Sequence, residues 1–246
     1  MIPDRYLRFI TSLPEGEFNG PDRLLVPDLL LGSDEQSGVS VYYAPFSWHN
    51  TQARLAIIGV TPGFTQMEIV FRVVRRELLT GAATHDACRR AKYAASFAGT
   101  MRQNLINMLD GIGLPELIGT SSESLFGEAS HLLHTTSAVS FPVFVHGQNY
   151  TGSRPRLVHS AFLMKYVREQ LAPELTSLER ACFLPLGKAV DDALRVLEDE
   201  GLIPAGRTLY GFPHPSGANG HRKRQFDSAR DRLREGLRTA LLPNKN

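Results

Sequence analysis

His214 stands between two prolines in the sequence GFPHPSGANGHRKRQF (residues 211–226). Proline on both sides stiffens the backbone and removes N–H donors, so the imidazole is held on a rigid segment. A histidine positioned in this way can donate a hydrogen bond to negative charge that develops during a reaction. A capping or surface histidine is the alternative, and this segment alone leaves both interpretations open.

The segment after His214 combines small residues with positive charge. Ser216 to Gly220 can offer backbone N–H groups and a hydroxyl to a phosphate. Basic side chains follow directly, at His221, Arg222, Lys223 and Arg224. The pattern predicts a phosphate site, for nucleic acid, a nucleotide or a sugar phosphate.

A second glycine-rich turn, GVTPG (residues 59–63), leads from an apolar run into a helical pattern. Gly59 and Gly63 permit close backbone approach, and the first N–H groups of the following helix can bind an anion or a carbonyl oxygen. The turn has neither the Gly-Lys-Ser/Thr ending of a P-loop nor the G-x-G-x-x-G dinucleotide fingerprint. By itself it is equally consistent with a simple turn.

The remaining candidates for chemistry are weaker. His131 and His134 are three residues apart, but no Asp, Glu or Cys stands at matching spacing, so we expect core or pocket histidines and no metal site. Asp191 and Asp192 are predicted on a solvated helix face. Two distant cysteines, Cys88 and Cys182, lack C-x-x-C partners and read as small buried hydrophobes.

Composition sets the class of protein. The chain has 246 residues, of which 42% are apolar and 21% are charged, as in one large α/β domain or two small ones. No segment approaches the length of a membrane span, and the N-terminus does not read as a secretory signal, so we expect a cytoplasmic protein. From Arg207 onward nine Lys and Arg face three Asp and Glu, which indicates either a polyanionic partner or a solvated basic helix.

Short apolar runs alternate with helical patterns along the chain. The four predicted strands cover residues 55–60, 131–139, 181–186 and 207–212. The predicted helices cover residues 65–79, 85–112, 155–171 (opening at Pro155), 187–202 and 225–242. This alternation predicts a mainly parallel sheet, whose carboxyl edge would gather the segment after each strand. The first 50 residues read as irregular, with residues 39–48 as an edge strand or a packing arm.

Taken together, four motifs resemble the uracil-DNA glycosylase superfamily. GVTPG is similar to its first motif and HPSGANGHR to its second, while LPLGKAV resembles its L-G-x-x-A turn and LLHTTSAVSFP its base-reading strand. The resemblance covers roughly residues 55 to 230. It implies a single domain over residues 1–246, a three-layer α/β/α fold with a central four-stranded parallel sheet, and hydrolysis of the N-glycosidic bond of a flipped-out base.

The resemblance assigns roles in the second motif. His214 matches the histidine that stabilises the departing base as an anion. Pro215, Ser216 and Gly217 match the loop that grips the phosphate and the minor groove. Ala218 and Asn219 fall where many members insert a leucine wedge, and alanine is small for that task, so Asn219 or a residue of the 146–154 loop would fill the gap.

The first motif carries the water-activating loop of the resemblance. Gly59, Pro62 and Gly63 match it, but Thr61 stands where members carry the Asp or Asn that positions water. Thr136 falls about where several branches place a base-reading Asn, and its hydroxyl alters the pattern that selects uracil. The resemblance also implies an aromatic residue that stacks on the flipped base, for which Phe64 and Phe71 are the candidates.

Gly63 takes the place of a tyrosine that blocks bases with a 5-substituent. The resemblance therefore implies a DNA glycosylase for a 5-substituted pyrimidine, for example glucosylated hydroxymethylcytosine in phage DNA, or for uracil. It implies DNA as partner, no cofactor, no metal, no membrane and a monomer. A catalytically silent binder of modified DNA and a nucleoside or nucleotide hydrolase for small substrates remain the alternatives.

Overall fold

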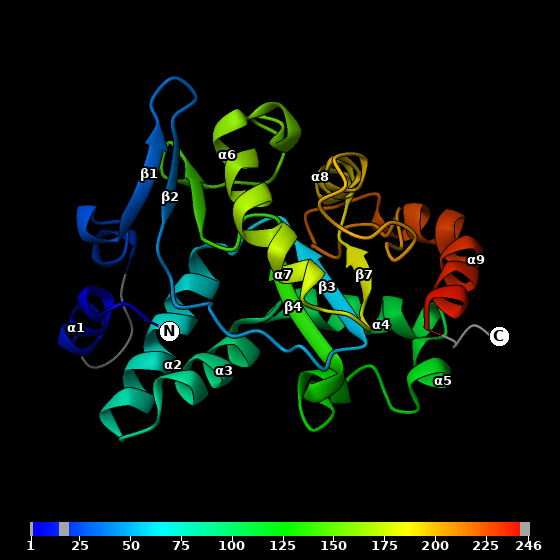
Figure 1. Cartoon of the computed structure of the whole chain (residues 1–246), viewed down its shortest axis with the longest axis horizontal. Helices are drawn as coiled ribbons and strands as arrows, with labels where there is room; N and C mark the ends of the chain where they lie inside the picture. Colours follow the sequence, from blue (N-terminus) through cyan, green and yellow to red (C-terminus); the bar gives the residue numbers. More distant parts are fainter. Residues whose placement is uncertain (1, 15–19, 242–246) are drawn as a thin grey trace. The chain divides into compact units, whose positions relative to one another are not determined.

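The protein is described from a computed structural model covering residues 2–14 and 20–241 (Figure 1). Its contacts divide the chain into two compact units. Unit 1 comprises Met1–Trp48, Thr61–Ala98 and Val139–Thr151, and unit 2 comprises His49–Val60, Gly99–Ala138 and Gly152–Asn246. The single domain expected over residues 1–246 stays a prediction, and each unit is described by itself.

Unit 1 contains an antiparallel sheet that the sequence did not predict. Its strands are β1 (Leu30–Asp34), β2 (Val39–Tyr42), β5 (Val143–Val145) and β6 (Gln148–Asn149), in the order β1-β2-β5-β6. Alternation along β2 buries Val39 and Val41 and leaves Ser40 and Tyr42 partly exposed. The expectation of an edge strand within residues 39–48 is wrong, because β2 pairs on both sides. The alternative of a packing arm agrees with the residues that follow it, since Tyr43, Ala44 and Trp48 are buried in the core of unit 1.

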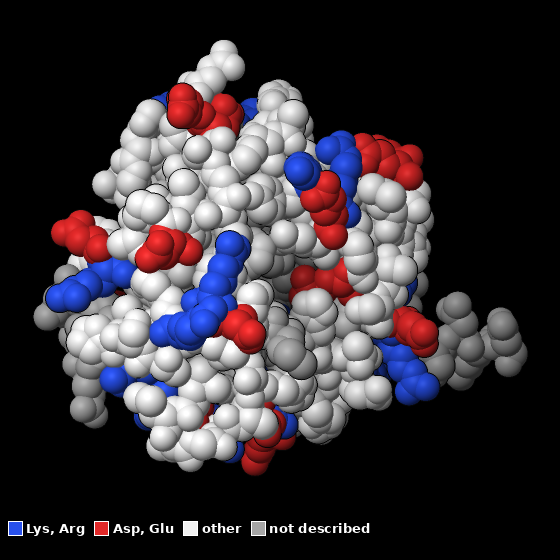
Figure 2. All heavy atoms as spheres, turned by 60° about the vertical axis from the view of Figure 1, so that its left-hand side comes forward, with Lys and Arg blue, Asp and Glu red and all other residues white. Residues whose placement is uncertain are grey.

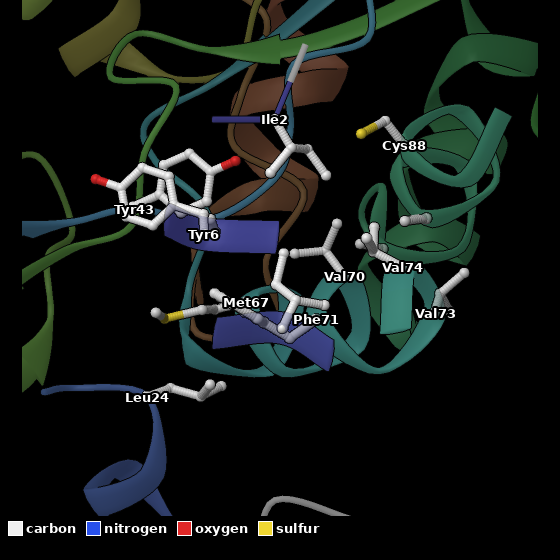
Figure 3. Packing of buried hydrophobic residues seen from close by; sticks show 14 of the residues in the cluster. Ile2, Tyr6, Leu24, Tyr43, Met67, Val70, Phe71, Val73, Val74 and Cys88 are labelled. Atoms are coloured by element: carbon white, nitrogen blue, oxygen red, sulfur yellow. The ribbon is translucent and has the colours of Figure 1, made fainter. Parts of the chain in front are cut away.

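The first 50 residues are also more regular than expected. They form helix α1 (Asp4–Ser12) and two short 3-10 turns, Pro21–Arg23 and Pro27–Leu29, before the first two strands. Residues 1 and 15–19 lie outside the described part. Tyr6 of α1 stacks on Tyr43 with 3.5 Å between ring centroids, so this segment contributes to the core of unit 1 (Figure 3).

Helices α2 (Phe64–Leu79) and α3 (Thr84–Ala95) complete the core of unit 1. Phe71 of α2 is fully buried in it, among Val70, Val74 and Met67 (Figure 3), and lies edge-on to Phe9 at 6.3 Å. A ring enclosed in this way cannot stack on a flipped-out base. The assignment of Phe71 as a base-stacking aromatic is therefore wrong, which leaves the half-buried Phe64.

Unit 2 contains the expected parallel sheet. Strands β3 (Leu55–Gly59), β4 (Leu133–Ser137) and β7 (Cys182–Pro185) confirm three of the predicted strands, and they run side by side in the order β4-β3-β7 (Figure 1). The fourth run, residues 207–212, pairs parallel to β7 only through the isolated bridges Phe183↔Thr208 and Leu186↔Phe212. A turn at Tyr210 and Gly211, where Gly211 has φ +86°, interrupts it.

The helices of unit 2 depart from two predicted boundaries. The helix expected over residues 85–112 is broken, since Phe97 and Gly99 adopt left-handed φ values of 51° and 83°, and α4 (Thr100–Gly111) starts anew in unit 2. Pro155 is not a first helical residue. Helix α6 (Ala161–Tyr166) starts six residues later, where the Ser160 hydroxyl accepts a hydrogen bond from the N–H of Leu163 at 3.2 Å.

Short and regular helices make up the rest of unit 2. The π-helical turn Val167–Leu171 leads into α7 (Ala172–Thr176), and α8 (Lys188–Asp199) and α9 (Arg222–Leu241) match predicted helices. Residue 242, the predicted end of the last helix, lies outside the described residues. The other elements are α5 (Leu114–Ile118) and the 3-10 turns Ser124–Phe126, Ser130–Leu132 and Leu157–His159.

Two general expectations can be compared with this fold. Cys88 and Cys182 are both free and buried, which confirms their reading as small hydrophobes. Within residues 2–14 and 20–241, the structure has no helix with the length and apolar character needed to cross a membrane.

The burial of Phe71 predicts a large effect on stability. Phe71→Ala should lower the free energy of unfolding of unit 1 by about 3–5 kcal/mol, because it removes a fully buried ring and leaves a cavity. Phe64→Ala, at a half-buried ring, is the matched control and should lower it by much less. Urea unfolding followed by the fluorescence of Trp48, the only tryptophan, checks this; equal losses in both variants would contradict it.

Candidate functional site

The carboxyl edge of the parallel sheet in unit 2 gathers four chain segments. Gly59 ends β3 opposite Ser137, and its carbonyl accepts the N–H of Ala138 at 2.8 Å. After β7, the N–H of Leu186 donates to Ile58 O at 2.9 Å. The sequence predicted that these segments end together, and the structure places them so within this unit.

His214 reaches this edge through a backbone contact with the turn after β7. The N–H of Gly187 donates to the carbonyl of Phe212 at 2.8 Å. Gly187 has φ +83°, and a Cβ added there would lie 3.1 Å from His214 Cβ. Glycine is needed at this position both for its backbone conformation and for the close approach of His214.

The hydrogen bonds of His214 determine its tautomer. Its Nδ1 accepts the N–H of Ser216 at 3.2 Å, so the proton of the neutral ring is on Nε2. Burial lowers the pKa of His214, which favours the neutral ring at neutral pH. Nε2 is therefore a hydrogen-bond donor that does not depend on a positive charge.

The loop after His214 is held by its own side chains. Ser216 Oγ accepts the N–H of Ala218 at 3.2 Å. Asn219 donates from Nδ2 to His214 O at 3.2 Å and accepts the N–H of His221 at 3.3 Å. Because its amide is engaged on both sides, Asn219 serves as a brace, while Gly217 and Ala218 form the exposed tip.

The basic residues at the start of α9 have different surroundings. The guanidinium of Arg222 donates to Ser216 O at 2.8 Å, Pro215 O at 3.2 Å and Asn104 Oδ1 at 3.3 Å, and therefore braces the loop. Lys223 and Arg224 are exposed, and their side chains make no hydrogen bond or ion pair with other residues of the described part. Cations are disfavoured at a helix N-terminus, by about 0.3–1 kcal/mol each, unless an anion binds there.

Asp191 corrects the expectation of a solvated face. Its Oδ2 accepts the N–H of Gly211 at 2.8 Å, and its Oδ1 is buried without a partner in the described structure. Burial raises the pKa of Asp191 from 3.8 to about 6. Asp192, by contrast, is ion-paired with Lys188 at 2.7 Å and Arg156 at 3.5 Å. Asp191 thus anchors the turn that leads into His214.

A buried carboxylate that the sequence reasoning missed lies beside β4. Glu174 Oε1 lies 2.7 Å from His134 Nε2, and its Oε2 accepts the hydroxyl of Thr136 at 3.0 Å. His49 Nε2 lies 3.6 Å from Oε1. His134 is fully buried, as expected of a core histidine, whereas His131 is exposed. A histidine in a buried strand needs a polar partner. The position of His134 in an apolar run therefore indicated that a polar side chain such as Glu174 would lie beside it.

The predicted first-motif residues from Thr61 to Phe64 belong to unit 1, not to the unit of His214. Thr61 Oγ1 donates to Phe141 O at 2.6 Å and accepts the N–H of Val143 at 3.1 Å. Its hydroxyl proton is therefore committed to a carbonyl. Pro62, the next residue, is half-buried.

Two N–H groups at the N-terminus of α2 already have side-chain acceptors. Gln66 Oε1 accepts the N–H of Gly63 at 3.1 Å, and Asn149 Oδ1 accepts that of Phe64 at 2.8 Å. A Cβ added to Gly63 would lie 3.0 Å from Gln66 Oε1. The space beside Gly63 is therefore bordered by the ends of two polar side chains, those of Gln66 and Asn149.

Charge is mixed on the face drawn in Figure 2, where Lys and Arg side chains alternate with Asp and Glu. The net charge of +2 is therefore not gathered on this face. Among the described residues, no group of three or more His, Cys, Asp or Glu is arranged to hold a metal ion.

Comparison with known proteins finds a relative that covers most of the chain. No protein-family model matches the chain. The chain is 39% identical over 225 residues to "Uncharacterized protein YoxB" of Bacillus subtilis (strain 168), and the match covers 89% of this chain and 88% of the relative.

The burial of Asp191 predicts a pH-dependent stability. Because its folded pKa is raised, its contribution is fully present below pH 3.8 and is lost as the pH rises through about 6. Asp191→Asn keeps an acceptor for Gly211 and cannot ionise. We expect its free energy of unfolding to be about 1 kcal/mol higher than that of the wild type at pH 8, allowing for solvent screening, and nearly equal to it at about pH 3.

Thermal or urea unfolding at the two pH values measures this. Asp192→Asn is the control, since that carboxylate is ion-paired and should not be stabilised by neutralisation. A gain in Asp191→Asn that is the same at both pH values would show that ionisation of Asp191 is not its cause.

Proposed function

The chain belongs to the family of the B. subtilis protein YoxB, and we propose that it is a monofunctional DNA glycosylase of the uracil-DNA glycosylase superfamily. The enzyme would hydrolyse the N-glycosidic bond of a flipped-out damaged or modified base and leave an abasic site. One observation carries the proposal: His214, on a rigid Pro-His-Pro segment at the carboxyl edge of a parallel sheet, holds a neutral ring with its proton on Nε2.

The order of chain segments supports the finer fold. Adding residues 207–212 to the named sheet gives the order β4-β3-β7-(207–212), all parallel. Helix α7 lies in front of this sheet and α4 behind it (Figure 1). The superfamily's three-layer fold with a four-stranded parallel sheet is therefore part of the proposal.

DNA would bind at the loop tip and the start of α9. Gly217 and Ala218 are exposed beside Ser216, and Lys223 and Arg224 extend from the next turn. Their charge would neutralise backbone phosphates and release counterions, which makes the affinity salt-dependent. The target base is then extruded at a cost of a few kcal/mol.

His214 would act on the departing base. As the bond between C1′ and the base nitrogen breaks, its electron pair moves onto the base. Nε2–H donates a hydrogen bond to the base oxygen on which this charge collects. Water adds hydroxide to C1′, and its proton goes to the base or to solvent. The hydroxyl of Thr61 would be a poor base for activating this water. When the transition state resembles an oxocarbenium ion at the sugar, however, the reaction depends little on the strength of the nucleophile.

The substrate we propose is a 5-substituted pyrimidine, for example glucosylated hydroxymethylcytosine in phage DNA, or uracil. Gly63 supports this, since the corresponding tyrosine in the superfamily excludes such bases, and the polar side chains beside Gly63 end in flexible groups. The enzyme would act as a cytoplasmic monomer, in base-excision repair or in defence against phage.

A silent binder of modified DNA is the second candidate. It is favoured by the Thr61 hydroxyl, whose proton is committed to Phe141 O. A hydrolase of free nucleosides or nucleotides is the third. Incubation with duplexes carrying uracil, hydroxymethyluracil, hypoxanthine, thymine mismatches or glucosylated hydroxymethylcytosine, followed by alkaline cleavage, separates the three. Binding without cleavage indicates the silent binder, and cleavage of free nucleosides alone the small-substrate enzyme.

His214→Ala should lower the single-turnover excision rate about 100-fold or more, because it removes the donor to the leaving base. His131→Ala replaces an exposed histidine of the same unit and should leave the rate unchanged. In the wild type, protonation of His214 at low pH places a proton on Nδ1 and breaks its hydrogen bond with the Ser216 N–H, which releases the ring from its position. The rate should therefore fall at low pH, with a midpoint below the ordinary histidine pKa. An unchanged rate in His214→Ala would remove this residue from the mechanism.

The double variant Lys223→Gln/Arg224→Gln should weaken DNA binding and flatten the plot of log K against log salt by about 2, since two phosphate contacts are lost. Arg222→Gln should change this slope much less, because its guanidinium is already engaged by the loop carbonyls and by Asn104. Fluorescence anisotropy between 50 and about 300 mM salt measures both. Equal slopes in the wild type and the double variant would contradict the assignment.

A further inference from the structure

We propose that Thr136 selects a base that carries an exocyclic amino group, so that the substrate is a cytosine-type pyrimidine and not a uracil-type one. The inference rests on the proposed function. It is argued from the hydrogen bonds of Thr136, Glu174, His134 and Asn50, all of which belong to unit 2.

The orientation of His134 is determined by its two ring nitrogens. Its Nδ1 accepts the backbone N–H of Asn50 at 3.2 Å, so the proton of the neutral ring is on Nε2. That proton points at Glu174 Oε1, at 2.7 Å. His134 is therefore a donor to Glu174 and not an acceptor from it.

Glu174 in turn determines what the Thr136 hydroxyl can do. The carboxylate is buried, with a side chain 4% exposed, and its Oε2 lies 3.0 Å from Thr136 Oγ1. His49 Nε2, 3.6 Å from Oε1, adds a positive partner whenever that ring is protonated, which favours the ionised carboxylate. An ionised carboxylate only accepts hydrogen bonds, so the hydroxyl proton of Thr136 must be donated to Oε2.

A hydroxyl whose proton is already donated in a hydrogen bond can act toward a ligand only as an acceptor, through its lone pairs. Thr136 is half-buried at the carboxyl end of β4, opposite Ile58 and next to the edge where Gly59 ends β3. The negative charge of Glu174 lies directly behind it. Lone pairs backed by a carboxylate attract an N–H group and repel a carbonyl oxygen. At position 4 of a pyrimidine, cytosine-type bases present an amino group and uracil-type bases a carbonyl.

The test compares two duplexes that differ only at this position, with 5-hydroxymethylcytosine or 5-hydroxymethyluracil as the target. The wild type should excise the cytosine-type base with a kcat/KM at least tenfold higher. Equal excision, or faster excision of the uracil-type base, would overturn the inference and leave the proposed function intact. Excision of neither base, nor of any other base in the panel, would overturn the proposed function, and this inference with it.

Glu174→Gln tests the cause of the preference. The new amide can accept from His134 with its oxygen and donate to Thr136 with its nitrogen, which frees the hydroxyl of Thr136 to donate to a carbonyl. We expect the preference for the cytosine-type base to fall at least fivefold or to reverse. Thr136→Val, which has no hydroxyl, should abolish the preference. An unchanged preference in both variants would overturn the inference.

Glu169→Gln provides the matched control. It removes an exposed carboxylate five residues from Glu174 and should leave both the activity and the preference unchanged. The comparison of the two bases by the wild type does not depend on the folding of any variant.

Discussion

The position of His214 depends on a contact between two backbones. Gly187 donates its N–H to Phe212 O, and its missing side chain lets His214 Cβ approach the turn after β7. A side chain at Gly187 would strain a φ of +83°, and its Cβ would lie in tight contact with His214 Cβ, at 3.1 Å. Because Pro213 and Pro215 leave the histidine little backbone freedom, this one contact determines where the imidazole lies along the sheet edge.

Two carboxylates, the half-buried Asp191 and the buried Glu174, support this edge in different ways. Asp191 holds the N–H of Gly211, where residues 207–212 turn away from β7, and thus directs the chain toward His214. Glu174 holds the side chains of β4 from the facing helix, through His134 and Thr136. An ionised carboxylate in a poorly solvated place strengthens the hydrogen bonds that it accepts, and it imposes a direction on every donor around it.

The basic segment at the start of α9 shows how burial divides residues that look alike in sequence. Arg222, Lys223 and Arg224 are adjacent cations, but only the first lies against loop carbonyls and Asn104. A helix turns by about 100° per residue, so neighbouring side chains face different surroundings. The N-terminus of α2 is a second example. The sequence suggested that its N–H groups could bind an anion, but Gln66 and Asn149 accept hydrogen bonds from two of them.

By itself, the sequence determined the three buried parallel strands, most of the helices and the gathering of loops at one sheet edge. Hydrophobic runs and helical spacing are local properties, so a single chain displays them directly. Only the tertiary structure decided that Phe71 is a core residue and that residues 39–42 form an inner strand of a second sheet. It also decided that Glu174 and one carboxylate oxygen of Asp191 are buried. These outcomes depend on partners far away in the chain, such as Gly211 for Asp191 and His134 for Glu174, and no local pattern records which distant group a side chain will meet.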